Sequence, residues 1–172
     1  MTFWKHLRAI VLLPGIVGVV IPAAILLLTG VAWPPSWWNL AFGALPIFLG
    51  LGLMISTNRL FTTVGHGTLA PWNPTQRLVV RGVYRHVRNP MISGVFCILL
   101  AEAIFFGSWW LSGWFGVFVL VNAIYIPLVE EPGLAERFGD DYLRYKENVP
   151  RWIPRLKPWR GSSGMEQDRP EM

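Results

Sequence analysis

The chain has 172 residues, of which 53% are hydrophobic, ten are tryptophan and one is cysteine. It is long enough for one domain and too apolar for an ordinary soluble fold, so the composition indicates a membrane protein. A net charge of +5 would suggest a nucleic-acid partner in a soluble protein, but here membrane orientation and anionic headgroups account for it. The single Cys97 excludes an intrachain disulfide and a cysteine-based zinc cluster.

Four apolar stretches follow one another along the chain, at residues 7–28, 37–56, 92–107 and 114–129. The first two are long enough, at about 1.5 Å per residue, to cross a hydrocarbon core of roughly 30 Å. The last two have about 16 residues each, so we expect a tight helical hairpin, joined by residues 108–113, that just reaches the far interface. The first stretch contains Pro14 and Pro22 and no cleavage pattern, which favours a retained helix over a signal peptide.

The positive charges predict the orientation in the membrane. All fifteen Lys and Arg residues fall in three segments, which are Lys5 with Arg8, residues 59–88 and residues 137–169. Under the positive-inside rule this predicts an all-α, polytopic bundle of about four transmembrane helices with both termini in the cytosol. An aromatic belt at the opposite interface fits the tryptophans near the uncharged loops, Trp33, Trp37, Trp38, Trp109, Trp110 and Trp114.

We predict a single membrane domain over residues 1–160 and a polar, disordered tail over residues 161–172. Two cytosolic segments, residues 57–89 and 130–157, flank the hairpin and are too long and irregular to be mere connectors. The chemistry is expected in these two segments.

The first segment ends where the third apolar stretch begins. Pro90 disfavours helix at Asn89 and suits the first turn of the following helix. Arg88 and Asn89 therefore lie at a helix N-terminus that faces the cytosol, where backbone N–H groups can hold a carboxylate or a phosphate. The alternative is that Arg81, Arg85 and Arg88 only contact lipid headgroups.

In the second segment, Glu130 and Glu131 end an apolar helix, where two adjacent negative charges are costly unless a cation meets them. Adjacent helical residues point about 100° apart, so one Glu can face into the bundle and the other can face water. Pro132 is expected to break or restart the helix, and Pro127 to kink it. The alternative is a solvated helix end with a salt bridge to Arg137 or to the other loop.

S-adenosylmethionine explains both segments together. Its amino-acid end carries an ammonium and a carboxylate, and its sulfonium is cationic. A Glu can bind the ammonium and an Arg can bind the carboxylate in a bidentate way. The adenosine needs an aromatic or apolar slot, for which the candidates are Tyr84, Tyr142, Tyr145 and Trp152.

Motif order, spacing and membrane context together resemble the isoprenylcysteine carboxyl methyltransferase and phospholipid methyltransferase superfamily, over about residues 65–154. The resemblance rests on Gly82-x-Tyr84, Arg88-Asn-Pro90-Met, Glu130-Glu131-x-x-Leu134-x-x-x-Phe138-Gly139-x-x-Tyr142-x-x-Tyr145 and Val149-Pro-Arg-Trp-Ile-Pro154. It implies a membrane-embedded methyltransferase in which S-adenosylmethionine lies between the Arg-x-Pro segment, the Glu-Glu segment and the C-terminal region.

The cofactor residues implied by position are Arg88, Asn89, Pro90, Glu130 and Glu131, with Gly82 and Tyr84 shaping the approach and Tyr142 and Tyr145 at the adenosine. The chain departs from the family pattern at two positions. Asn89 stands where His is common, and Ile92 stands where Tyr is frequent. Because Asn cannot titrate near neutral pH, a role as a base at this position is in doubt.

Glu102 lies about ten residues into the third stretch, roughly 15 Å deep by helical rise. It either lines a substrate cavity, with Trp152 as a second substrate contact, or is protonated or paired within the bundle. His66 and His86 have no second ligand at metal spacing, so no metal site is expected.

The expected function is methyl transfer from S-adenosylmethionine to a lipid-like, prenylated or otherwise apolar acceptor at the cytosolic face of a bacterial inner membrane. A carboxylate acceptor is already ionised, whereas an amine would need a base that the sequence does not offer, so a carboxylate or thiol-like acceptor is favoured. Two alternatives stay open: an NADPH-dependent membrane reductase of the sterol-reductase type, and a non-enzymatic membrane scaffold.

Overall fold

The computed structural model describes residues 11–30, 36–63 and 78–161, and all regular secondary structure in these ranges is helical. This confirms the predicted all-α class. The elements in chain order are the π-helix η1 (Val11–Val20), α2 (Ile21–Thr29), α3 (Trp37–Thr63), the 3-10 helix η2 (Gly82–Arg85), α4 (Pro90–Phe106), α5 (Trp109–Tyr125), the π-helix η3 (Ile126–Glu130) and α6 (Glu131–Asn148).

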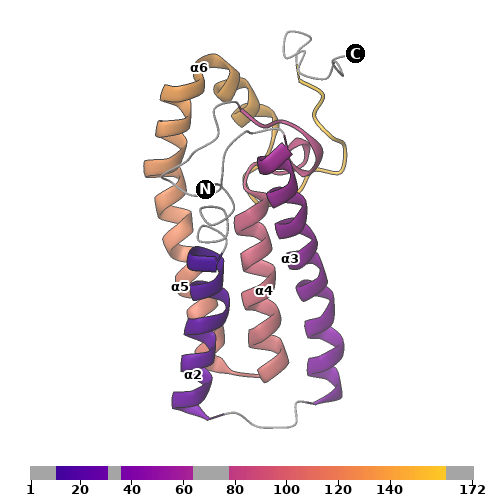
Figure 1. The fold of residues 1–172 in the computed structure, drawn as a ribbon, viewed down its shortest axis with the longest axis vertical. Coiled ribbons are helices and arrows are strands. Elements are labelled where there is room, and N and C mark those ends of the chain that lie inside the picture. The colour runs from indigo at the N-terminus through magenta and orange to yellow at the C-terminus, as the bar shows by residue number, and fades with distance from the viewer. Residues whose placement is uncertain (1–10, 31–35, 64–77, 162–172) are drawn as a thin grey trace.

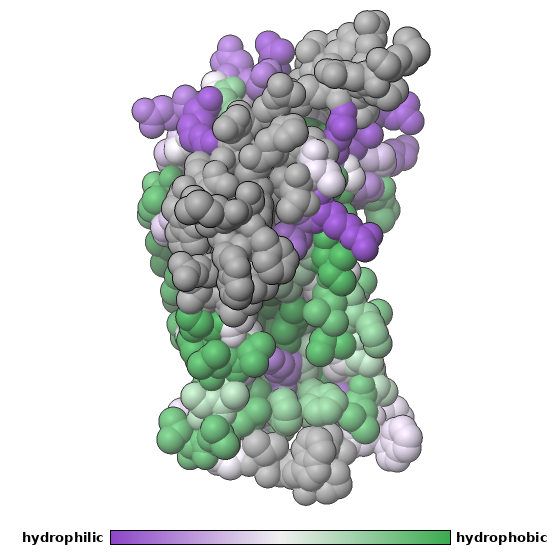
Figure 2. All heavy atoms as spheres, viewed as in Figure 1, coloured by the Kyte–Doolittle hydropathy of each residue, from purple (hydrophilic) through white to green (hydrophobic). Residues whose placement is uncertain are grey.

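The long helices run side by side along one axis of the molecule (Figure 1). Helix α4 packs against α3 on one side and α5 on another, while η1 contacts α4 and α2 contacts α5. The indole N–H of Trp114 ties α5 to η1 by donating to the Val17 carbonyl at 3.1 Å. Figure 2 shows hydrophilic side chains gathered at the end of the bundle that carries α6, and hydrophobic side chains along its length.

Among the described residues two helices are long and apolar enough to cross a membrane, Trp37–Leu60 and Trp109–Asn148, whereas Gly15–Thr29 and Pro90–Phe106 are shorter apolar helices. The second contains a non-helical residue at Gly139, and we assign to the membrane only its apolar part, which ends at Val129. The four-crossing topology with cytosolic termini stays a prediction. Lys5, Arg8 and the predicted tail from residue 162 onward lie outside the described residues.

The hairpin between α4 and α5 is tighter than predicted. Its connection is not residues 108–113 but only Gly107 and Ser108, so α5 begins at Trp109. Gly107 ends α4 in the left-handed conformation, with φ +56°, which glycine adopts without a Cβ clash. The Ser108 side chain then accepts a hydrogen bond from the Leu111 N–H and caps α5. Because the stop and start signals are adjacent, no loop is needed.

The two prolines after α5 do not end the helical path. The backbone stays in the right-handed helical region at Glu130 and Glu131, and the wide turn of η3 contains Pro127. A π-turn tolerates the missing N–H of Pro127, and Pro132 lies in the first turn of α6, where the helix needs no N–H. Of the two outcomes expected at Pro132, the break is absent and the restart is present, because α6 begins at Glu131 and continues the helical path of α5 and η3.

Glycines set the close contact between α3 and α4. A Cβ at Gly50 would lie 2.7 Å from the Gly94 carbonyl oxygen and 2.8 Å from Ile98 Cγ1. A Cβ at Gly94 would in turn lie 3.0 Å from the Gly50 carbonyl oxygen. Small residues of this kind let helix backbones approach each other, which is a common way to associate helices in lipid.

We predict that Gly50→Ala lowers the free energy of unfolding by about 1–3 kcal/mol, because the added methyl group meets backbone and forces α3 and α4 apart. Gly52→Ala is the matched control, since a Cβ there meets no atom within 4 Å. It should leave stability unchanged or raise it through helix propensity. Thermal unfolding in detergent measures both, and equal midpoints for the two variants would contradict this packing.

Candidate functional site

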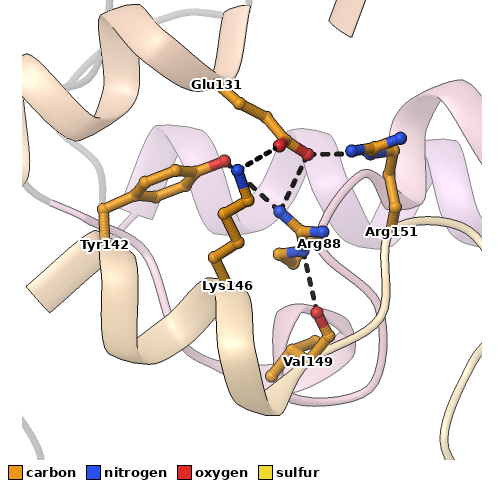
Figure 3. Close-up of polar contacts among 6 residues, drawn as sticks. All are labelled: Arg88, Glu131, Tyr142, Lys146, Val149 and Arg151. Carbon is orange, nitrogen blue, oxygen red and sulfur yellow. Dashed lines mark hydrogen bonds and ion pairs between the residues drawn. The ribbon is translucent and has the colours of Figure 1, made fainter. Parts of the chain in front are cut away.

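A buried carboxylate lies at the charged end of the bundle, and three cations surround it (Figure 3). The Glu131 side chain is 2% exposed. Its Oε1 accepts hydrogen bonds from Arg88 Nη1 at 2.9 Å and Arg151 Nε at 2.7 Å. Its Oε2 lies 2.8 Å from Lys146 Nζ. One carboxylate therefore joins the start of α4, the end of α6 and the segment after α6.

Glu131 lies beyond the apolar part of its helix, and its charge is stabilised by these contacts. Burial alone would raise the pKa of Glu131, but the contacts with Arg151 and Lys146 and the charge of Arg88 lower it to about 2. The carboxylate is thus ionised at neutral pH. Lys146 and Arg151 keep partial contact with water, with exposed side-chain fractions of 43% and 27%, whereas Arg88 is 9% exposed.

Arg88 is held by more than its ion pair. Its Nε donates to the Val149 carbonyl at 2.8 Å, and its Nη1 also reaches the Tyr142 hydroxyl at 3.4 Å. Its backbone N–H donates to the Pro150 carbonyl at 2.9 Å. The guanidinium is consequently fixed by both the Glu-Glu segment and the C-terminal region.

The C-terminal strap, which we define as residues 149–160, lies along the segment that precedes α4. The Asn89 N–H donates to the Arg151 carbonyl at 3.2 Å. Two further backbone bonds follow, from Arg155 N–H to the His86 carbonyl at 3.0 Å and from Trp159 N–H to the Arg85 carbonyl at 2.9 Å. This backbone pairing positions Arg151 next to Glu131.

A reversal within α6 brings its second half back to Glu131. Gly139 has φ +54° and ψ −136°, a conformation that strains any residue with a Cβ. The residues after it turn so that Tyr142 and Lys146, one helical turn apart, face the carboxylate (Figure 3). The predicted motif contained Gly139 without assigning it this role.

The tyrosines of the motif are core residues in this structure. Tyr142 and Tyr145 are each 3% exposed and pack with the buried Val149. The Tyr145 hydroxyl donates to the Tyr84 carbonyl at 2.7 Å, and burial, followed by the nearby Tyr145, raises the pKa of Tyr84 well above its ordinary value. Tyr142 also contacts Arg88 of the ion cluster, which we define as Glu131, Arg88, Lys146 and Arg151. The predicted contact of these rings with an adenosine stays a prediction.

The two glutamates divide as the helical geometry predicted. Glu131 faces inward, and Glu130 is exposed. Glu131 pairs with Arg88, Lys146 and Arg151, so the salt bridge to the other loop that the alternative allowed is present, through Arg88. Across the described residues Glu130 has no ion pair.

Two buried donors lie beside the cluster. Asn89 Nδ2 and Trp152 Nε1 find no hydrogen-bond partner in the described part of the chain. The Trp152 ring packs edge-on against Phe96 of α4, with 5.6 Å between ring centroids. Pro90 is buried and begins α4, as predicted.

Two predicted residues stand apart from the cluster. Gly82 has φ +53° and opens η2, where a Cβ would lie 3.1 Å from Leu60. Glu102 is twelve residues after Pro90 on α4, about 18 Å away by helical rise. Its Oε2 is buried without a partner among the described residues, and the structure does not bring it to the site.

Sequence reasoning missed Lys146 and Arg151 as members of the site. Lys146 follows Tyr142 by four residues and therefore shares its helical face, a signal that the sequence does contain. Arg151 lies within the quoted Val-Pro-Arg-Trp motif, but its partner could be found only once the strap was placed along residues 85–89.

We predict that Glu131→Gln lowers the free energy of unfolding by about 2–3 kcal/mol, because three cations lose their shared counter-charge. The loss stays below that of a fully buried pair, since Lys146 and Arg151 remain partly solvated. Glu136→Gln, an exposed position on the same helix, is the control and should change stability little. If chemical unfolding in detergent shows equal losses for both variants, the carboxylate does not organise the site.

Gly139→Ala is expected to destabilise the protein by about 1–3 kcal/mol through backbone strain alone, because a Cβ there meets no atom within 4 Å. Gly133→Ala, also in α6 and also in open space, should be neutral or stabilising. Differential scanning calorimetry compares the two variants. A stable Gly139→Ala protein would mean that α6 does not need this reversal.

Comparison with known proteins places this geometry in context. Residues 38–141 match the family described as "Phospholipid methyltransferase", a range that is more than half of the chain and contains Arg88, Glu130 and Glu131. A protein of Haemophilus influenzae, named "Uncharacterized protein", is 38% identical over 65 residues, which are 37% of this chain and 100% of that protein.

Proposed function

The chain belongs to the phospholipid methyltransferase family, and we propose that it transfers a methyl group from S-adenosylmethionine to a lipid-like acceptor at the membrane surface. One observation carries the proposal. Arg88 and Glu131 are 43 residues apart in sequence, yet they meet at 2.9 Å where the apolar bundle ends. Both lie in the range that the family match covers.

The donor and acceptor groups at this end of the bundle fit the amino-acid part of S-adenosylmethionine. Glu131 already meets three cations, so we assign the ammonium to Glu130, which is exposed and has no ion pair in the described ranges. The surplus of positive charge on Arg88, Lys146 and Arg151 favours the carboxylate. This assignment refines the sequence reading, which gave the ammonium to a Glu without choosing between the two.

The buried donors support a ligand at the same place. Unpaired buried polar groups cost free energy and call for a partner that completes them. Asn89 Nδ2 and Trp152 Nε1 are such groups. A carboxylate, a ribose hydroxyl or an adenine nitrogen would each accept a hydrogen bond from them.

When bound, S-adenosylmethionine would supply an electrophilic methyl group. The chain would contribute positioning, since alignment of two reactants in a water-poor site can account for much of such a rate enhancement. The ion cluster would fix the ligand, and the apolar helices next to it would hold the lipid-like acceptor. With no base assigned, an acceptor that is already ionised needs only alignment.

The test is isothermal calorimetry of S-adenosylmethionine with the purified protein in detergent. Glu130→Gln is expected to weaken binding about tenfold or more, the loss of one charge-assisted contact. Glu136→Gln, which keeps the same net charge as Glu130→Gln, should bind like the unaltered protein.

Methyl transfer is then followed with S-adenosylmethionine labelled in its methyl group and a bacterial lipid extract. Radioactivity is expected in the organic phase with the unaltered protein and Glu136→Gln, and strongly reduced with Glu130→Gln. Absence of both binding and transfer would refute the proposed function, whereas binding without transfer to lipid would refute the acceptor class alone.

A further inference from the structure

The C-terminal strap leaves two of its aliphatic side chains uncovered. Ile153 is 81% exposed and Leu156 is 97% exposed, although they lie within a segment that is otherwise fixed by backbone hydrogen bonds. Apolar side chains that an ordered segment exposes to water are unfavourable in free energy, and together they indicate a contact surface.

Between its backbone hydrogen bonds with residues 85–89, the strap approaches the apolar part of the bundle. The Pro150 carbonyl accepts a hydrogen bond from the Arg88 N–H. The Trp152 carbonyl lies 3.4 Å from the hydroxyl of Ser93, in the first turn of α4. The Trp152 ring reaches Phe96, one turn further along α4. The strap then returns, because the Arg155 N–H bonds to the His86 carbonyl and the Trp159 N–H bonds to the Arg85 carbonyl.

Ile153 therefore lies at the turning point of the strap, level with the first turns of the apolar helix α4. Leu156 lies on the returning arm, one residue after Arg155. Basic residues flank them on the returning arm. Lys157 and Arg160 are exposed, and Arg155 is partly exposed while it donates to the Asn148 carbonyl at 2.6 Å. Apolar tips between basic side chains match the boundary between acyl chains and anionic headgroups.

We propose that the strap is an interfacial anchor: Ile153 and Leu156 insert into the bilayer, Ile153 more deeply than Leu156, and Lys157 and Arg160 contact anionic lipid phosphates. The occupant of this surface is the lipid of the same membrane, since Trp152 of the strap packs on Phe96 of the apolar helix α4 and the exposed Lys157 and Arg160 are complementary to anionic lipids. The proposal does not depend on methyl transfer. It implies that Arg151 and Trp152, which lie on the same strap, are held at a fixed depth.

The test is spin-label accessibility of the full chain in lipid nanodiscs, in a Cys97→Ser background. Labels are attached at Leu156→Cys and, as a control, at Glu147→Cys on the exposed side of α6. Oxygen, which concentrates in lipid, is expected to relax the label at 156 more than a water-soluble nickel chelate does. The ratio of the two effects should place this label about 5–10 Å below the membrane surface. At 147 the nickel chelate should have the larger effect.

Three results would overturn the anchor. Preference for the nickel chelate at 156 would place the strap in water, and protection from both reagents would mean that a protein surface covers it. A depth that does not increase from zwitterionic nanodiscs to nanodiscs containing phosphatidylglycerol would remove the role of Lys157 and Arg160. A second label at Ile153→Cys must give the same order as the label at 156, which guards against a distortion by either probe.

Discussion

A buried carboxylate without partners is costly, and the charged end of this protein is arranged around that constraint. Glu131 meets Arg88, Lys146 and Arg151, which come from three separate segments. A different local feature positions each segment: Pro90 starts α4 just after Arg88, Gly139 reverses the direction of α6, and backbone hydrogen bonds fix the strap. The site is therefore an assembly of distant pieces on one acidic group.

This arrangement gives the adjacent glutamates different tasks. Glu131 is occupied by the protein itself, whereas we propose that the exposed Glu130 binds the ligand. The buried tyrosines stabilise the same end, since Tyr145 bonds to the Tyr84 carbonyl and Tyr142 contacts Arg88. In this proposal stability and ligand binding depend on neighbouring residues, which allows the two to be separated by substitution.

Much of the fold could be predicted because its signals are local. Apolar stretches, Pro90 and the clustering of Lys and Arg gave the helices and the charged end, and the family match confirms the resemblance drawn from the Arg88 and Glu130-Glu131 motifs. The two-residue hairpin turn was missed because the Gly107 and Ser108 caps are adjacent. The helical path past Pro127 and Pro132 was missed because a π-turn lets the helix continue there. The roles of Lys146 and Arg151 depend on long-range pairing, which no local pattern encodes.

The most direct measurement is a double-mutant cycle on Glu131 and Arg151, with free energies of unfolding determined in detergent for the unaltered protein, Glu131→Gln, Arg151→Gln and the double variant. The cycle removes the separate contact of Arg151 with the Trp152 ring, because that contact is lost with and without Glu131. If the carboxylate joins the strap to α6, the two losses should couple by about 1–3 kcal/mol. Additivity within about 0.5 kcal/mol would show that the segments are held by other contacts and would contradict this account.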